Sequence, residues 1–115
     1  MFYPSITLPA VIPSGQSQSG NLQTGGLHLI ELLMPAAWDA AALTFLGSLD
    51  GTNFFPLVND AGTEASFTVT ANRVVRFPSG FFGGVPFLRL RSGNLTTPVN
   101  QTAARTINVF ARQAQ

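Results

Sequence analysis

The sequence predicts an all-β protein, an antiparallel β-sandwich of jelly-roll type with an extended N-terminal arm. Three observations lead to this prediction: short apolar runs that alternate with polar residues, turn signals rich in Gly, Asn, Asp and Pro between the runs, and a length of 115 residues that suits one domain. About eight short strands at close spacing favour a sandwich over a barrel. We expect the arm to occupy residues 1–26 and the sandwich residues 27–115.

The first 26 residues carry no charged side chain and include the low-complexity run SGQSQSGN. Ile6 and Leu8 alternate with polar neighbours, which predicts a short strand. Pro9 places that strand at a sheet edge, because proline has no N–H to donate to a ladder. Such an arm can pair with a neighbouring molecule, so Ile6 and Leu8 are candidate interface residues.

The segment from Leu27 to Met34 is apolar on both of its alternating faces. A short helix is the competing interpretation, but Gly25-Gly26 before the segment and Pro35 after it favour a strand of about eight residues. A strand that is apolar on both faces has to be covered on both sides.

The next stretch, residues 35–57, joins an Ala-rich turn, a strand, a second turn and another strand. Asp50-Gly51 predicts a tight hairpin between these strands, because both residues readily adopt positive φ angles. Trp38 lies in the Ala-rich turn, where we expect its ring to hold the turn over one end of the sandwich. Trp38, Asp50 and Gly51 are therefore predicted to be structural.

Four further strands are predicted after a second hairpin signal at residues 59–63. They cover residues 65–70, 73–77, 87–92 and 105–111. In the third of them Leu88 and Leu90 alternate with Arg89 and Arg91, so we expect the leucines in the core and the arginines on the opposite face.

The composition indicates a surface that is covered by other protein. Only 10% of the residues are charged, against about 25% in an ordinary soluble domain, and all six basic residues are arginines. No segment is long and apolar enough to predict a membrane span, and no Lys or Arg precedes Arg73 to form the basic region of a secretory signal. We therefore expect a homo-oligomer or a complex with another protein.

The chemistry-bearing residues do not form a catalytic or metal-binding pattern. The chain has no cysteine, and its single histidine, His28, is predicted to face away from Glu31 on a regular strand. We expect no enzyme activity, no metal and no cofactor.

The basic residues do not indicate a nucleic-acid surface either. A net charge of +1 without lysine gives a weak attraction for phosphates, so we do not expect nucleic-acid binding. Arg89 and Arg91 are expected instead to pair with carboxylates or with the carbonyls of a neighbouring subunit.

The aromatic residues leave a second function open. A ring in a loop can stack on a sugar, and five aromatics lie in or near predicted loops: Trp38, Phe54, Phe55, Phe81 and Phe82. The competing interpretation is that these rings fill the core. Neighbouring residues on a strand or loop tip cannot both point inward, so Phe81 or Phe82 is expected to contact a partner.

Three motifs carry a family resemblance: PAAWDAAALTFLGSLDGTNFFPL at residues 35–57, FLRLRSG at 87–93 and PVNQTAART at 98–106. They resemble motifs of small virion structural proteins of tailed bacteriophages and gene transfer agents, of the head spike or head decoration type. Arg89 stands where that pattern has lysine, and the arm is not covered by the resemblance.

The resemblance implies a non-enzymatic β-sandwich that decorates a capsid or forms the base of a head spike or fibre. The expected partners are further copies of the chain, as a trimer or pentamer, together with the major capsid protein or a spike or fibre protein. The expected location is the virion, after assembly in the host cytoplasm. A carbohydrate- or receptor-binding module of the particle, or a neck or tail accessory protein, is the alternative.

Overall fold

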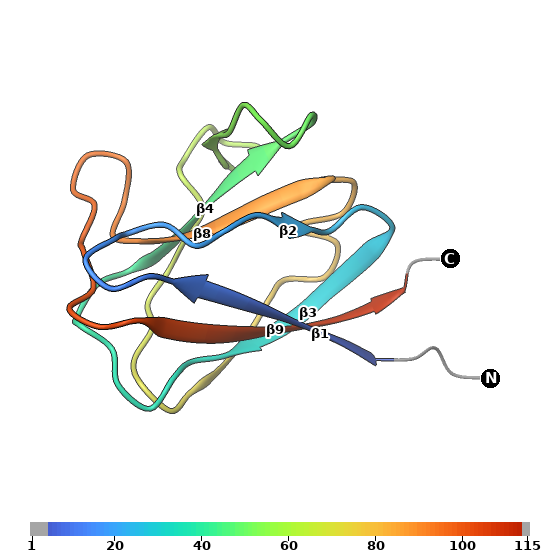
Figure 1. The fold of residues 1–115 in the computed structure, drawn as a ribbon. Coiled ribbons are helices and arrows are strands. Elements are labelled where there is room, and N and C mark those ends of the chain that lie inside the picture. Colours follow the sequence, from blue (N-terminus) through green and yellow to red (C-terminus); the bar gives the residue numbers. More distant parts are fainter. Residues whose placement is uncertain (1–4, 114–115) are drawn as a thin grey trace.

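A computed structural model describes residues 5–113 as nine β-strands in two antiparallel sheets that face each other as two layers (Figure 1). The described residues contain no helix. The strands are β1 (Ser5–Ile12), β2 (Leu22–Gln23), β3 (Leu27–Leu33), β4 (Leu43–Ser48), β5 (Phe55–Pro56), β6 (Ser66–Phe67), β7 (Val74–Arg76), β8 (Phe87–Ser92) and β9 (Arg105–Gln113). The predicted all-β class and sandwich-like layering are confirmed.

The strand order differs between the two layers. Sheet A has the order β1-β9-β3-β7, and sheet B has the order β2-β8-β4-β5, with β6 also paired to β4. Every strand pairing is antiparallel. Successive strands therefore cross repeatedly between the sheets, which brings β1 and β9 from opposite ends of the chain side by side (Figure 1).

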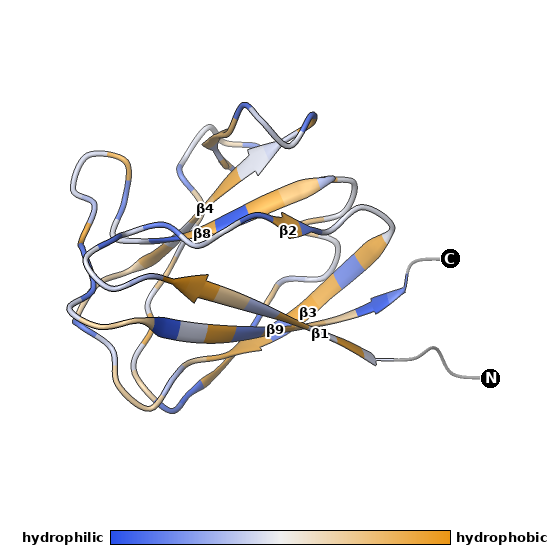
Figure 2. Ribbon diagram, in the orientation of Figure 1, coloured by the Kyte–Doolittle hydropathy of each residue, from blue (hydrophilic) through white to orange (hydrophobic). Residues whose placement is uncertain are grey.

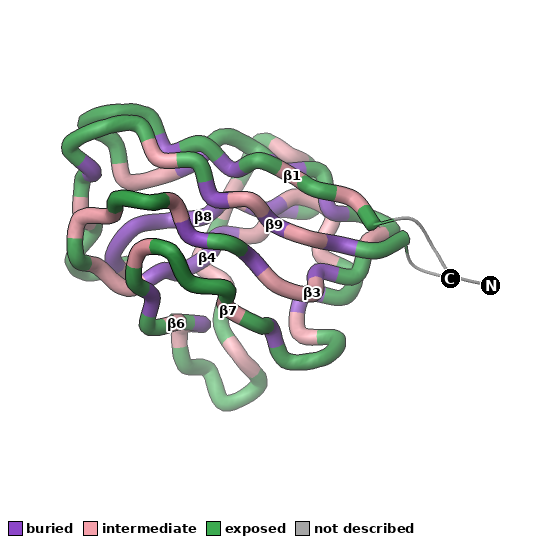
Figure 3. Tube along the Cα trace, turned by 90° about the horizontal axis from the view of Figure 1, so that it is seen from below, coloured by how far each residue is buried: buried purple, intermediate pink, exposed green. Residues whose placement is uncertain are grey.

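The core lies between the sheets and follows the predicted alternation in the last two strands. In β8, Leu88 and Leu90 are buried, and in β9 Ile107, Val109 and Ala111 are buried. Figure 3 shows this period of two along β9, and Figure 2 shows hydrophobic and hydrophilic residues alternating along the strands. The leucine positions predicted for residues 87–92 are confirmed.

A bulge changes the faces of β3. The strand exists as predicted, but its pairing with β9 shifts register between Leu29 and Glu31. Leu29 and Leu32 are both buried, while Leu33 is exposed. The expectation of a strand covered on both sides is therefore wrong, because one extra residue lets β3 bury apolar side chains that a regular strand would place on opposite faces.

The expected N-terminal arm is corrected by the pairing of β1. Residues 5–12 form an eight-residue strand hydrogen-bonded to β9, and Ala10 and Ile12 are buried in the core. β2, at residues 22–23, joins sheet B, so the predicted boundary after residue 26 does not separate an arm from a domain. The part of the expected arm at residues 1–4 lies outside the described residues. The sequence did not indicate that residues 5–12 belong to the sandwich, because an uncharged edge strand that contains proline has the same composition as a flexible tether.

Pro9 lies on the edge strand predicted for it. The carbonyl of Val11 accepts a hydrogen bond from Gly20 N at 3.3 Å, on the side of β1 that faces away from β9. Alternate residues of a strand direct their backbone groups to the same side, so Pro9 also directs its backbone to this outer edge. The ladder with β9 consequently loses no hydrogen bond to the proline.

A buried polar network fixes the loop before β4 against the end of the core. Gln101 is fully buried, and its Nε2 donates to Asp39 O at 3.1 Å and to Ser92 Oγ at 2.7 Å. Its Oε1 accepts from Asp39 N at 2.8 Å and from Arg105 Nε at 3.1 Å. Arg105 also pairs with the Asp39 carboxylate at 3.1 Å, so one glutamine joins three segments of the chain without an unsatisfied buried group.

The glycine after β8 has no room for a side chain. Gly93 has a φ of 90°, and a Cβ there would lie 2.4 Å from Thr97 O and 2.7 Å from Val99 N. Gly84 has a similar φ of 82°, but nothing lies within 4 Å of its Cβ position. Alanine substitutions at Gly93 and Gly84 therefore separate the free-energy cost of a positive φ from that of a steric clash.

We expect Gly93→Ala to destabilise the protein by about 1 to 3 kcal/mol more than Gly84→Ala, as overpacking does. Both variants should share a cost of about 1 to 2 kcal/mol for the left-handed backbone. Urea unfolding followed by circular dichroism measures both. Equal stabilities of the two variants would contradict the close backbone contact at Gly93.

Two neighbouring residues of β1 test whether this strand belongs to the core. Ile12 is 0% exposed and Val11 is 43% exposed. We expect Ile12→Ala to cost about 2 to 5 kcal/mol of unfolding free energy, and Val11→Ala less than about 1 kcal/mol. If Ile12→Ala melts like the unaltered protein, β1 is not an integral strand.

Candidate docking surface

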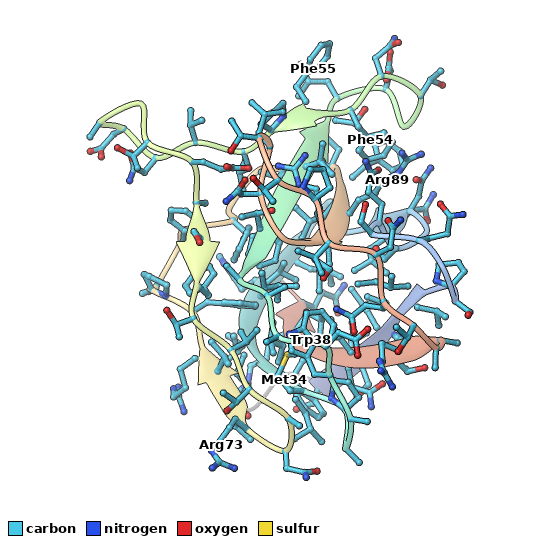
Figure 4. All side chains as sticks on the ribbon, turned by 90° about the vertical axis from the view of Figure 1, so that its left-hand side faces the viewer. Met34, Trp38, Phe54, Phe55, Arg73 and Arg89 are labelled. Atoms are coloured by element: carbon cyan, nitrogen blue, oxygen red, sulfur yellow. The ribbon has the colours of Figure 1, made fainter. Side chains whose placement is uncertain are left out.

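Exposed apolar side chains gather on the excursion that joins β4 to β6. Leu49 is 86% exposed, Phe55 is 66% exposed and Val58 is 50% exposed. Figure 4 shows Phe55 projecting outward at the upper edge of the molecule. We call Leu49, Phe55 and Val58 the apolar rim. Side chains of this kind are costly in water unless another surface covers them.

A groove of about 470 Å³ lies beside the rim. Its walls come from the end of β4, the following loop, β5 and the turn before β8, and it is lined by Gly47, Ser48, Leu49, Asp50, Asn53, Phe55, Pro56, Leu57, Gly83, Gly84 and Val85. Gly47 lies beneath Val85 and Leu57, whose side-chain carbons lie 3.4 and 3.5 Å from its Cβ position. Asp50 is the one charged residue among the lining residues.

The loop after β4 is built around the Asp50 carboxylate. Oδ1 accepts hydrogen bonds from Thr52 N at 2.9 Å, from Asn53 N at 2.8 Å and from Ser48 Oγ at 2.9 Å, and Oδ2 accepts from the Asn53 amide at 2.8 Å. These hydrogen bonds, the two backbone bonds first, hold the pKa of Asp50 well below its ordinary value. The carboxylate thus stabilises the loop in its charged form.

The tight Asp50-Gly51 hairpin is corrected in its details. Gly51 has a positive φ of 78°, but Asp50 does not, and the loop between β4 and β5 spans residues 49–54. The positive φ of Gly51 favours glycine, and the Phe87 ring lies 3.3 Å from its Cβ position, so a side chain here would require that ring to shift. Asp50 and Gly51 form a wide Asx-type loop in which the side chain replaces the cross-strand bonds of a hairpin.

Phe81 and Phe82 both pack toward the interior, so the premise that neighbouring residues here cannot both point inward is wrong. Phe82 is 2% exposed and lies 4.9 Å from Phe45, measured between ring centroids, and Phe81 packs against Phe67 at 6.3 Å. They lie in a turn, where Gly83 N donates to Gly80 O, and a turn does not alternate its side chains as a strand does.

The side chains of Arg89 and Arg91 project from the same face of β8, but their surroundings differ. Arg91 is 3% exposed, pairs with Glu64 and donates through Nε to Thr44 Oγ1 at 3.1 Å. It is therefore not available as an interface residue. Its pairing with a carboxylate occurs within the chain.

Arg89 lies nearer the surface. Its guanidinium lies 4.0 Å from the centroid of the Phe54 ring (Figure 4), and Nε donates to Asn21 Oδ1 at 2.6 Å. Phe54 therefore has one face covered by a cation. Phe54 and Arg89 thus hold the segment between β4 and β6 against the residues before β2.

The remaining predicted residues lie in or next to the core. Ile6 and Leu8 are half-buried on the inner face of β1, and Leu8 packs against the core. Trp38 is also half-buried against the core and donates from Nε1 to Ala41 O at 3.1 Å within its own turn. Leu49 and Val58 were missed by the sequence reasoning, although a leucine between a strand end and Asp50-Gly51 is a signal of an exposed apolar residue.

Residues 5–113 contain neither a metal-binding cluster nor a membrane-spanning helix. No group of three or more His, Asp or Glu side chains in that range could hold a metal ion. No helix there is long and apolar enough to cross a membrane. Comparison of the chain with protein-family models, with curated proteins and with solved structures gives no match.

The lowered pKa values of Asp50 and Asp39 predict acid sensitivity. The ordinary value is 3.8, and the folded values lie below it, so the unfolded chain takes up protons first as the pH falls. Their stabilisation is present above about pH 4 and is lost as the pH falls through the folded pKa values. Asp39 owes its shift first to Thr102 N, which donates to its carboxylate at 2.7 Å.

We expect Asp50→Asn to melt at a lower temperature than the unaltered protein at pH 7, and the gap to narrow below about pH 4. Thermal melts between pH 2 and pH 7 measure this gap. Asp60→Asn, which removes the same charge from the exposed 59–63 turn, is the control. A gap that stays constant with pH would show that the Asp50 charge does not stabilise the loop.

Proposed function

We propose that the protein is a non-enzymatic structural component of a virion, which self-associates and decorates a capsid or supports a spike or fibre. The observation that carries the proposal is the apolar rim, Leu49, Phe55 and Val58, on a chain with only 10% charged residues. Covering the rim removes apolar surface from water and therefore lowers the free energy of the molecule.

The use of the carboxylates supports a structural role. Asp39 pairs with Arg105, Glu64 pairs with Arg91, and Glu31 pairs with Arg76 at 3.3 Å. The Asp50 carboxylate holds a loop. Groups committed to such contacts are poorly placed to exchange protons with a substrate.

A second copy of this chain is the occupant that we assign to the apolar groove. The groove lining carries one side-chain charge, Asp50, whose carboxylate is already hydrogen-bonded within the loop. Two copies that contact each other at the groove therefore do not repel each other strongly. Phe55 or Leu49 of one copy has an apolar side chain of a size that fits the groove of about 470 Å³ on the other. A trimer or pentamer is the closed form that we expect on a capsid.

The strand orders support the finer fold assignment. We assign the sandwich to the jelly-roll type, since the orders β1-β9-β3-β7 and β2-β8-β4-β5, with β6 also paired to β4, distribute the strands between the two layers as two interlocked Greek keys do. Jelly rolls are common in viral capsid proteins, but a fold serves many functions. The motifs at residues 35–57, 87–93 and 98–106 add the resemblance to head spike and head decoration proteins.

A glycan-binding module of the same particle is the second candidate. Of the five aromatics that could stack on a sugar, Phe55 alone is exposed, while Trp38, Phe54 and Phe81 are half-buried and Phe82 is buried. The exposed Phe55 ring beside the groove is the observation that favours this candidate. Retention of the protein on immobilised glycans, with loss in Phe55→Ala, would support it.

Sedimentation velocity tests the proposed self-association. The unaltered protein should sediment as a closed oligomer of a 12.2 kDa chain. Leu49→Asp and Phe55→Asp should each weaken association by about tenfold or more, because they place a charge in an apolar contact. Leu95→Asp is the matched control, since Leu95 is 58% exposed but does not line the groove.

Three outcomes would contradict parts of the proposal. A monomer at micromolar concentration would refute self-association, and equal weakening by Leu95→Asp would refute the groove as the interface. For the virion assignment, the protein should co-purify with particles of its own source in a fixed ratio to the major capsid protein. Its absence from such particles would refute that assignment.

A further inference from the structure

A hollow of about 410 Å³ lies at sheet A, where β3, β9 and the turn after β7 meet. It is distinct from the apolar groove and shares no lining residue with it. Four nitrogen-bearing side chains line it, from His28, Arg76, Arg112 and Gln113, and the turn after β7 adds Ser79 and Gly80. No carboxylate is among its lining residues.

The bulge in β3 puts these side chains on one face. Opposite residues of paired strands share a face, and His28 lies opposite Arg112 while Glu31 lies opposite both Phe110 and Arg76. The residues between these on β9 point into the core, as Ala111 does. His28, Arg112 and Arg76 therefore all emerge from the outer face of sheet A, whereas a regular β3 would turn His28 and Glu31 to opposite sides.

The hollow is lined by hydrogen-bond donors. A guanidinium carries five N–H donors and no acceptor, and an imidazole donates at least one N–H in either protonation state. Arg76 contacts Glu31 Oε1 through Nη1 and is 74% exposed, so its other N–H groups can turn toward a ligand. The Ser79 hydroxyl is a further donor.

The local electrostatics favour an anion. His28 and Arg112 are directly opposite on adjacent strands, at a usual Cβ separation of about 5 Å, so one anion can accept hydrogen bonds from both the imidazole and the guanidinium. Arg91 and Arg105, by contrast, each pair with a carboxylate from a segment that is remote along the chain. Among residues 5–113 Arg112 makes no ion pair, so an anion in the hollow would supply it with a countercharge.

We propose that this hollow binds a tetrahedral oxyanion, a phosphate or sulfate group. Its donors come from three sides, namely β3, β9 and the turn after β7, and oxygens that point in several directions can accept from all three. A planar carboxylate presents two oxygens in one plane and would engage one guanidinium fork. The proposal does not depend on the proposed self-association.

The single histidine provides a direct measurement. The ring protons of His28 give one pair of imidazole signals in a proton NMR spectrum of the 115-residue chain. Inorganic phosphate and sodium sulfate are titrated separately at constant pH and constant ionic strength, with acetate as the planar comparison. We expect both tetrahedral anions to shift the His28 signals to saturation, and acetate to shift them at least about tenfold less effectively.

Matched arginine variants separate a site from general surface charge. Arg112→Gln should weaken phosphate binding by about tenfold or more, the loss of one charge-assisted contact. Arg73→Gln removes the same charge at the far end of the β3–β7 pair, outside the hollow, and should leave binding unchanged (Figure 4). Arg76→Gln serves as a second variant if Arg112→Gln does not fold.

Three results would overturn the proposal. The first is a His28 shift that rises linearly with phosphate and does not saturate. The second is equal weakening by Arg73→Gln and Arg112→Gln, which would indicate attraction by net charge alone. The third is acetate binding as tight as phosphate binding, which would exclude the tetrahedral class.

Discussion

The packing around Phe45 is the contact on which the rest of the structure depends. This ring on β4 lies edge-on to Phe67, Phe77 and Phe82, at centroid distances of 5.6, 6.1 and 4.9 Å. Its partners come from β6, from the residue after β7 and from the turn before β8, so one ring joins both layers and a loop. Aromatic pairs in this geometry add to the burial of their area, which suits a chain that has no disulfide.

Two arginines of this protein hold loops in place through ion pairs. Arg91 lies under the excursion with Glu64 and Thr44, and Arg105 joins Asp39 to Gln101 at the end of the core. Buried ionic contacts of this kind fix a loop in one position, and removing one partner leaves the other without compensation. The order of these two loops therefore depends on keeping both partners of each pair.

The sequence predicted the strands better than it predicted their faces. β8 and β9 were predictable because their core residues, Leu88 and Leu90 in one and Ile107, Val109 and Ala111 in the other, recur at every second position. The bulge in β3 was not, because leucine and isoleucine stand on both alternating faces of this segment, so an extra residue leaves no trace in the pattern. Arg89 and Arg91 look equivalent in the sequence, and their difference comes from Glu64, which is remote along the chain. The apolar rim was predictable in part. Phe55 was among the aromatics expected in or near loops, whereas the exposure of Leu49 depends on the loop that the Asp50 carboxylate stabilises.

The position of Pro9 limits how this molecule can grow. A sheet recruits another chain by hydrogen bonding along an open edge, and at the outer edge of β1 the proline offers a carbonyl without its matching N–H. The carbonyl of Val11, two residues on, is already taken by Gly20. A continuous intermolecular sheet is therefore interrupted at this strand, so a contact made along β1 has to depend on side chains of fixed shape. Side-chain surfaces can close into rings of defined size, whereas open strand edges extend into fibres.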